Sequence, residues 1–278
     1  LSTYCVDQRA ENHIRRPMLA SRVLMRASRI ISILTLVGVL GGSVPACGGP
    51  DELLVFAAAS LADAMGEIED AFEKRTATGV AVSYGASQAL AQQIAGGAPA
   101  DLFVSAGEFP FDFLAERGLL QPPAVHLLTT RLVVAVRSPS ETELVSMEQL
   151  TTPQVGRIAI AAPDLAPAGR YARDSLMSLG LWDQLRTKLV FGPDVRATIA
   201  YVESGNADAA IVYATDATAA PTITSFDIVP PGSHSPIVYP ASIVQRTKNA
   251  SVAKDFLDFL RGPEARQIFR EYGFEPIE

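Results

Sequence analysis

The 278-residue sequence has only two cysteines and three histidines, so the side chains that most often bind metals are scarce. Cys5 and Cys47 lie in the N-terminal segment, and the histidines are His13, His126 and His234. There is no CxxC pair, no HExxH motif and no cluster of Cys and His, the patterns typical of zinc and iron–sulfur sites. We therefore expect neither kind of metal site and no cysteine nucleophile.

Positive charge is also scarce over most of the chain. The formal net charge is −7, but residues 1–46 hold six arginines against Asp7 and Glu11, a local charge of +4. Residues 47–278 therefore hold 17 basic and 28 acidic side chains, a charge of −11. Because nucleic-acid binding needs clustered Lys and Arg to contact phosphates, we expect no nucleic-acid partner.

The N-terminal segment has a short hydrophobic run and no run of membrane-spanning length. Ile30–Leu40 is apolar over eleven residues, well below the roughly 20 that cross a bilayer. It follows the basic stretch Met25–Arg29 and precedes small residues, which is the pattern of a secretory signal over 25–46. Residues 1–24 fit neither a signal nor a domain, so we interpret them as a non-native extension, with the natural start at Met18 or Met25.

The end of this signal leaves two kinds of export open. Val44-Pro45-Ala46-Cys47 is similar to a bacterial lipoprotein signal, in which Cys47 becomes the lipidated first residue. Pro45 is unusual in such a signal, so plain secretion is the alternative. Cys47 would be the sole cysteine after cleavage and could form no internal disulfide, which favours lipidation. Residues 47–52 are interpreted as a linker.

From residue 53 onward, strand-like apolar runs alternate with helical patterns. Apolar residues make up 48% of the chain, enough for the core of one or two domains. Strands are predicted at 53–56, 80–84, 102–104, 132–136, 158–160, 189–191, 210–213 and 241–244. Strands separated by helices of ten or more residues predict an α/β fold with mostly parallel sheets. Crossings near 132 and 240 predict two lobes, 53–131 with 240–278 and 132–239.

Two serines follow consecutive strands and open the next helices. Ser60 comes after the first strand and forms a capping-box-like pair with Asp63, while Ser87 follows the second strand after a Gly85-Ala86 turn. A helix-capping role is the simpler interpretation of each serine. Both helix starts, however, would lie at one carboxyl edge of a sheet, where ligands bind, and free N–H groups there favour an anion.

The second half of the chain offers further donors. The segment 166–172 opens a helix with small residues, which let a ligand approach the backbone, and it contains Arg170. Arg170 could pair with an anion, but a solvated arginine or an inter-lobe ion pair is the simpler interpretation. Asp194 is predicted to cap the next helix, which leaves the amide of Val195 as a donor. Tyr213 ends a strand and carries a phenol that can donate one hydrogen bond.

Six motifs occur in order along the chain. They are Phe56-Ala57-Ala58-Ala59-Ser60-Leu61, Gly97-Ala98-Pro99-Ala100-Asp101-Leu102-Phe103-Val104-Ser105-Ala106, Pro167-Ala168-Gly169-Arg170-Tyr171-Ala172, Asp194-Val195-Arg196, Ile211-Val212-Tyr213-Ala214-Thr215-Asp216-Ala217 and Tyr272-Gly273-Phe274. Together they make residues 51–278 resemble the periplasmic molybdate-binding proteins of ABC importers.

That resemblance implies a two-lobe periplasmic-binding-protein fold of type II and a molybdate or tungstate oxyanion as ligand. It implies no cofactor, no directly coordinated metal, a membrane permease of an ABC transporter as partner, and a monomer outside the cytoplasmic membrane. The residues it implies for the oxyanion are Ser60, Ser87, Ala168, Val195 and Tyr213. Ser60 and Ser87 would give hydroxyl and backbone N–H groups, Ala168 and Val195 backbone N–H alone, and Tyr213 its hydroxyl. The family is often serine-rich where this chain has Gly85-Ala86-Ser87-Gln88.

Two other functions stay open on the residues alone. A serine hydrolase would use Ser87, in a turn like a nucleophile elbow, with Asp208 or Asp216 and then His234. His234 lies in a polar loop with the signature of a surface turn, which argues against a catalytic base. A receptor for another tetrahedral oxyanion, such as tungstate alone, is the nearer alternative, because molybdate and tungstate nearly coincide in size and charge.

Overall fold

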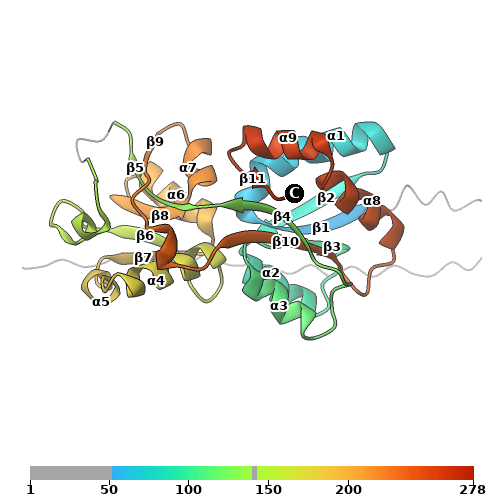
Figure 1. Ribbon diagram of the computed structural model, residues 1–278, viewed down its shortest axis with the longest axis horizontal. Helices are drawn as coiled ribbons and strands as arrows, with labels where there is room; N and C mark the ends of the chain where they lie inside the picture. Colours follow the sequence, from blue (N-terminus) through green and yellow to red (C-terminus); the bar gives the residue numbers. More distant parts are fainter. Residues whose placement is uncertain (1–51, 140–142) are drawn as a thin grey trace, which may run out of the picture. The chain divides into compact units, whose positions relative to one another are not determined.

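The computed structural model describes residues 52–139 and 143–278, which belong to one compact unit spanning 47–278 (Figure 1). The predicted extension 1–24, the signal 25–46, Cys47 and the linker up to residue 51 lie outside the described residues. Among the helices of the described part, none combines the length and the apolar character that crossing a membrane requires.

The first sheet has six strands in the order β11-β4-β10-β3-β1-β2. They are β1 (Leu53–Ala58), β2 (Val80–Gly85), β3 (Leu102–Val104), β4 (Val125–Thr130), β10 (Ile237–Ile243) and β11 (Glu275–Pro276). Strands β2, β1 and β3 are parallel, whereas β10 pairs antiparallel with β3 and β4. The parallel part places the carboxyl ends of β1 and β2 side by side.

Helices cover both faces of this sheet (Figure 1). They are α1 (Ala62–Thr76), α2 (Ser87–Ala95), α3 (Glu108–Ala115), α8 (Ala250–Leu260) and α9 (Pro263–Glu271), with a 3-10 turn, η1 (Ala59–Leu61), before α1. Helices α1, α8 and α9 lie on one face, and α2 and α3 on the other. Helix α1 buries its apolar residues at the predicted spacing, and Phe72 packs edge-on against Phe256 of α8 at 4.9 Å between ring centres.

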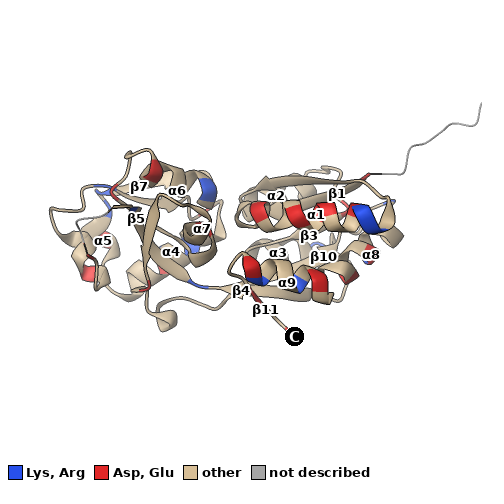
Figure 2. Ribbon diagram, turned by 90° about the horizontal axis from the view of Figure 1, so that it is seen from above, with Lys and Arg blue, Asp and Glu red and all other residues tan. Residues whose placement is uncertain are grey.

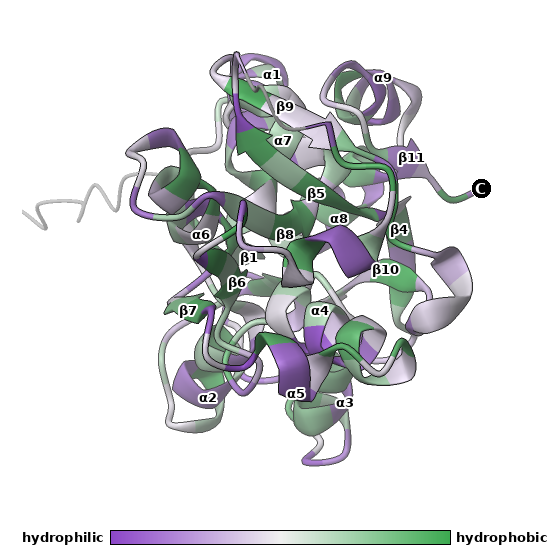
Figure 3. Ribbon diagram, turned by 90° about the vertical axis from the view of Figure 1, so that its left-hand side faces the viewer, coloured by the Kyte–Doolittle hydropathy of each residue, from purple (hydrophilic) through white to green (hydrophobic). Residues whose placement is uncertain are grey.

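The second sheet has five strands in the order β7-β6-β8-β5-β9. They are β5 (Leu132–Arg137), β6 (Ile158–Ala161), β7 (Leu189–Gly192), β8 (Ala209–Tyr213) and β9 (Ile223–Phe226). The elements around them are α4 (Pro167–Ser178), α5 (Trp182–Leu185), α6 (Val195–Glu203), α7 (Ala214–Ala219) and the 3-10 turns η2 (Met147–Thr151) and η3 (Pro231–Ser233). Strands β6 and β8 are buried along their whole length, and Figure 3 shows β5 and β8 in the hydrophobic colour. Continuous apolar runs are typical of strands covered on both faces.

Both sheets are mixed, although mostly parallel sheets were predicted. In the second sheet β6 is parallel to β7 and β8, but β5 is antiparallel to β8 and β9. The antiparallel pairs involve β4, β5 and β10, which lie next to the crossings of the chain between the two sheets. A strand that arrives from the other sheet has no crossover helix before it, so a parallel direction is not imposed. Strand β10 also begins at Ile237, three residues before the predicted boundary at 240.

Candidate anion-binding site

The five residues singled out in the sequence line one small cavity. Segments of both sheets contribute to its wall. The lining residues are Ala58, Ala59, Ser60, Gly85, Ala86, Ser87, Ala106, Ala166, Pro167, Ala168, Asp194, Val195 and Tyr213.

Ser60 and Ser87 reach the cavity because their strands are paired in register. Ala58 at the end of β1 pairs with Gly85 at the end of β2, and each serine lies two residues further along. Ser60 then falls in η1, and Ser87 is the first residue of α2. Both are buried, with 3% and 1% of their surface exposed. The predicted meeting of the two serines at one sheet edge is confirmed.

Neither serine caps its helix, so the capping interpretation was wrong for both. No side-chain cap bond occurs at η1, α1 or α2. The Ser60 Oγ instead lies 3.0 Å from the phenol oxygen of Tyr239, and the Ser87 Oγ accepts a hydrogen bond from the backbone N–H of Ala106 at 3.0 Å. Each hydroxyl is therefore fixed by a group from a distant part of the chain, since a buried polar group needs a partner.

On the side of the second sheet, two helix starts face the cavity. Ala168 is the second residue of α4, after Pro167, and Val195 is the first residue of α6. Amides in the first turn have no partner within their own helix. Asp194 caps α6, and its carboxylate accepts the N–H of Ala197 at 2.9 Å, which confirms the predicted cap. Position 169 in α4 has to be glycine, because a Cβ there would lie 1.8 Å from the carbonyl oxygen of Ala161 in β6.

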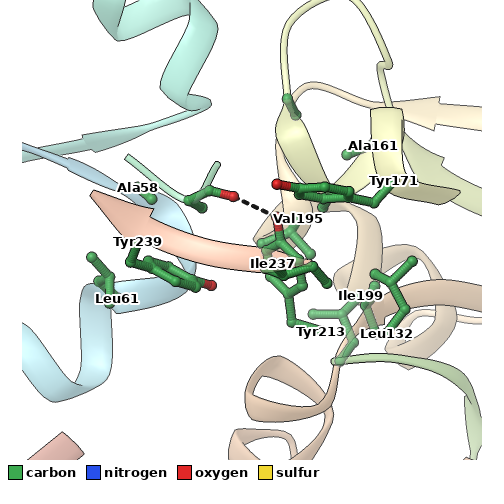
Figure 4. Close-up of a cluster of buried hydrophobic side chains, with 14 of the residues drawn as sticks. Ala58, Leu61, Leu132, Ala161, Tyr171, Val195, Ile199, Tyr213, Ile237 and Tyr239 are labelled. Carbon is green, nitrogen blue, oxygen red and sulfur yellow. Dashed lines mark hydrogen bonds between the residues drawn. The ribbon is translucent and has the colours of Figure 1, made fainter. Parts of the chain in front are cut away.

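Tyr213 ends β8 and brings a phenol to the cavity. Only 1% of its surface is exposed, and its hydroxyl donates to the carbonyl of Ala106 at 3.2 Å, the bond dashed in Figure 4. Burial raises the pKa of the Tyr213 phenol well above its ordinary value. The phenol therefore stays protonated, and in this structure its one proton is donated to the Ala106 carbonyl.

The wall of the cavity is nearly free of charge. Of the described residues that line it, none is Lys, Arg or His, and the carboxylate of Asp194 is engaged with its own helix. Arg170 is not a lining residue: its guanidinium lies over the Phe109 ring of α3, 4.4 Å from the ring centre. This contact joins the two lobes, although through an aromatic ring and not through an ion pair. Figure 2 shows acidic residues, in red, along the helices α1 and α9.

Comparison with known proteins identifies the family. Residues 53–275 match the model of the bacterial extracellular solute-binding proteins. The chain belongs to this family. It is 39% identical over 224 residues to a Bacillus subtilis protein, YvgL, named as a substrate-binding lipoprotein of an ABC transporter, covering 80% of this chain and 85% of that protein. It is 38% identical over 228 residues to the Escherichia coli molybdate-binding protein ModA, covering 80% and 88%.

Solved structures agree on the fold of this solute-binding protein. The periplasmic molybdate-binding protein of Azotobacter vinelandii superposes with a TM-score of 0.74 at 26% identity, over 81% of this chain and 100% of that one. The two-sheet α/β architecture is thus that of the two-lobe periplasmic binding proteins of type II, as the resemblance implied. Over residues 52–139 and 143–278, no group of Cys, His, Asp and Glu is arranged to hold a metal ion.

The alternative hydrolase triad is not assembled in this solute-binding protein. In the described part of the chain, Ser87 has no hydrogen bond to a histidine. His234 packs its ring 5.7 Å from the Tyr171 ring centre, and its Nδ1 lies 2.7 Å from the Ser235 carbonyl. Asp208 accepts the backbone N–H groups of Gly156 and Arg157 at 2.8 Å each. Asp216, the other acid considered, lies 3.1 Å from Arg196.

Sequence reasoning missed two residues that shape the cavity, Ala106 and Tyr239. Ala106 follows β3 and offers its N–H to Ser87 and its carbonyl to Tyr213, so it links three segments. Tyr239 lies in β10, is fully buried, and holds Ser60. The Tyr213 and Tyr239 rings lie near each other in Figure 4, with centres 6.2 Å apart. Tyr239 lies in none of the six motifs, whereas Ala106 is the last residue of the second motif.

Proposed function

We propose that this solute-binding protein captures molybdate in the cavity between its two sheets and delivers it to the membrane permease of an ABC importer. The observation that carries the proposal is the convergence of Ser60, Ser87, Ala168, Val195 and Tyr213 on one small, nearly uncharged cavity. The names of its relatives, which include molybdate-binding proteins, support the same ligand. Tungstate, of nearly the same size and charge, is proposed as a second ligand.

Neutral donors suit a dianion in a protein of this charge. A negative body cannot attract an anion over long range. Hydrogen bonds from N–H and O–H groups to a charged acceptor are strong in a cavity with little water. The starts of α4 and α6 add the positive ends of two helix dipoles. A ring of fixed donors also fits one anion size, so the smaller sulfate would form longer bonds.

The partners of the two serines leave their protons available for a ligand. The Ser87 Oγ accepts from the Ala106 N–H, so its own O–H is free to donate elsewhere. Ser60 shares one hydrogen bond with Tyr239, and when the Tyr239 phenol is the donor, the Ser60 proton is also free. Because burial raises the Tyr239 pKa well above its ordinary value, this phenol retains its proton. Both serines would then donate to the oxyanion.

We further propose that residues 53–131 with 240–278 form one lobe and residues 132–239 the other, and that they close over the ligand. Backbone contact across the cleft supports this arrangement: the Gln88 N–H of α2 donates to the Leu165 carbonyl at 3.1 Å. The Tyr213 bond to Ala106 also joins the two sides. All five residues proposed to bind the ligand come from a single chain, so the protein would act as a monomer.

Titration calorimetry with molybdate, tungstate, sulfate and phosphate tests the ligand. We expect molybdate and tungstate to bind with similar affinity, and sulfate and phosphate far more weakly. Molybdate at a thousandfold excess over its Kd should also stabilise the fold by about 4 kcal/mol. Equal binding of sulfate and molybdate would instead indicate a general receptor for tetrahedral oxyanions. No binding of any of the four anions would contradict the proposal.

We propose that the protein acts outside the cytoplasmic membrane and is anchored there through a lipid on Cys47. Membership of an extracellular solute-binding family and a relative named as a lipoprotein support this location. One acyl chain binds a membrane only marginally, so we expect at least two. Mass spectrometry of the native protein should find Cys47 acylated at the N-terminus. An unmodified N-terminus at a later residue would contradict the anchor.

A further inference from the structure

Arg196 lies beside the cavity without lining it, and its guanidinium contacts two carboxylates. It follows Val195 directly, in the first turn of α6. Its Nη2 lies 2.5 Å from the Oδ2 of Asp63, and its Nε lies 3.1 Å from the Oδ1 of Asp216. Asp216 is in α7 next to the second sheet and is fully buried, whereas the Asp63 side chain is 45% exposed.

The contact with Asp63 crosses from one sheet to the other. Asp63 belongs to α1, which follows β1 of the first sheet, and it lies three residues after Ser60. Arg196 lies one residue after Val195 in a helix of the second sheet. The ion pair therefore joins two segments that supply opposite walls of the cavity. It can form only when these segments are as close as they are here, because salt bridges need an N–O separation near 4 Å or less.

The second contact of Arg196 is with Asp216 on its own lobe. Asp216 is a fully buried carboxyl group on the same lobe as Arg196, and its Oδ1 lies 3.1 Å from the Arg196 Nε without a hydrogen bond between them. Arg196 stays on this lobe whether or not Asp63 is near, because it belongs to the first turn of α6. Asp63, on an exposed helix surface, is the half of the contact that would separate when the lobes move apart.

We propose that Arg196 and Asp63 form a latch that holds the closed cleft and slows the escape of the bound oxyanion. This inference rests on the proposed function, since it concerns the same cavity. The latch acts through lobe position and touches no ligand, so Arg196 is a positioning residue. Its effect falls on dissociation, because the pair forms after the ligand has entered and the lobes have met.

The alternative role for Arg196 is electrostatic screening. Asp63, Asp194 and Asp216 all lie near the cavity, and Arg196 offsets part of their negative charge. The two roles predict opposite results for Asp63→Asn. Removing a negative charge near the site favours a dianion if screening is the whole role. Removing half of the latch weakens retention of the same dianion.

The experiment measures the release of radiolabelled molybdate into an excess of unlabelled molybdate. We expect Asp63→Asn to raise the dissociation rate about fivefold and leave the association rate nearly unchanged, as for a modest ion pair. Asp258→Asn is the matched control, because Asp258 pairs with Lys254 within α8 at 2.5 Å and carries the same charge. That variant should release molybdate at the wild-type rate.

A second variant, Arg196→Met, tests the same ion pair from the other side, and the wild-type protein tests whether molybdate binds at all. Arg196→Met should raise the dissociation rate, and adding Asp63→Asn to it should raise the rate no further, because the pair is already broken. An Asp63→Asn protein that releases molybdate at the wild-type rate, or more slowly, would overturn the latch while the proposed function stands. A wild-type protein that binds no molybdate would instead overturn the proposed function.

Discussion

The two sides of the cavity are built from different kinds of donor. The first-sheet side has Ser60 and Ser87, whose hydroxyls are held by distant groups of the protein. The second-sheet side has Ala168 and Val195, which offer backbone amides at the starts of α4 and α6. A side chain can be removed by substitution, but a backbone amide can only be moved. The first side should therefore respond to changes in donors, and the second to changes in helix position.

Gly169→Ala tests the second side and should have the largest effect on anion binding. The new Cβ would lie 1.8 Å from the Ala161 carbonyl oxygen, so α4 must move away from β6 and take the Ala168 amide with it. We expect loss of molybdate binding and a free energy of unfolding lowered by at least about 3 kcal/mol. Calorimetry and denaturant unfolding measure the two quantities.

Gly66→Ala is the control for this substitution. Gly66 lies in α1 on the exposed side, and nothing would lie within 4 Å of its added Cβ. Alanine favours a helix interior, so this variant should be more stable by about 0.5–1 kcal/mol and bind molybdate normally. Normal binding by Gly169→Ala would show that the position of α4 does not matter to the site.

Ser60→Ala and Ser87→Ala test the first side and should have the next largest effect. Each removes a hydroxyl donor to a charged ligand, worth about 1.5–3 kcal/mol, so the molybdate affinity should fall about tenfold to a hundredfold. Each also leaves a buried partner, the Tyr239 phenol or the Ala106 N–H, without its bond. The free energy of unfolding should therefore fall by about 1–3 kcal/mol.

Ser175→Ala is the control that separates the loss of molybdate affinity from the loss of stability. Ser175 is a fully buried serine of α4 whose hydroxyl contacts Ser233 at 2.7 Å, away from the cavity lining. It should lower the free energy of unfolding without changing the molybdate affinity. Wild-type affinity in both Ser60→Ala and Ser87→Ala, measured by calorimetry, would remove the serines from the proposed site.

Tyr239→Phe tests whether the hydrogen bond that orients the Ser60 hydroxyl contributes to molybdate binding, in addition to the hydroxyl itself. The variant keeps the ring and the Ser60 hydroxyl but removes the group that orients that hydroxyl. A neutral hydrogen bond contributes about 1 kcal/mol, so the affinity for molybdate should fall about fivefold. Tyr272→Phe is the control, because the Tyr272 phenol contacts Glu67 on the exposed surface. Equal affinities of the two variants would contradict a role for Tyr239.

Substitution of Asp216 should have the smallest effect on the affinity for molybdate. The burial of this residue affects the stability of the fold instead. Burial raises the pKa of Asp216 from 3.8 to about 7, against the opposing effect of Arg196 and with smaller raising effects from Asp63 and Asp194. The folded protein therefore holds a proton that the unfolded chain releases between these two pH values. This contribution to the free energy of unfolding is full below the lower pKa and is lost as pH rises through about 7.

Asp216→Asn should flatten that pH dependence, because the amide does not titrate. Denaturant unfolding of both proteins from about pH 4 to about pH 8 measures the difference in slope. The molybdate affinity should change little, since Asp216 does not line the cavity. The same slope in both proteins over this range would show that Asp216 does not titrate there.

Much of the local structure could be predicted because its signals lie close together in the sequence. The apolar runs that became β1, β6 and β8 are continuous, and the spacing of apolar residues in α1 matches its buried face. The cap at Asp194 needs only a carboxylate three residues before an amide. The strands β4 and β9 were not predicted, because each is only partly buried and lacks a long apolar run.

The candidate site was predicted as a set of positions, but not as a set of contacts. The sequence by itself determined that two serines follow consecutive parallel strands and that helices begin near Ala168 and Val195. Only the tertiary structure decided that Tyr239, 179 residues from Ser60, holds its hydroxyl, and that Arg196, 133 residues from Asp63, reaches it. It also decided that β10 enters the first sheet antiparallel. Periodicity and capping act over a few residues of chain, whereas these contacts depend on how complete sheets and helices pack, which no local pattern records.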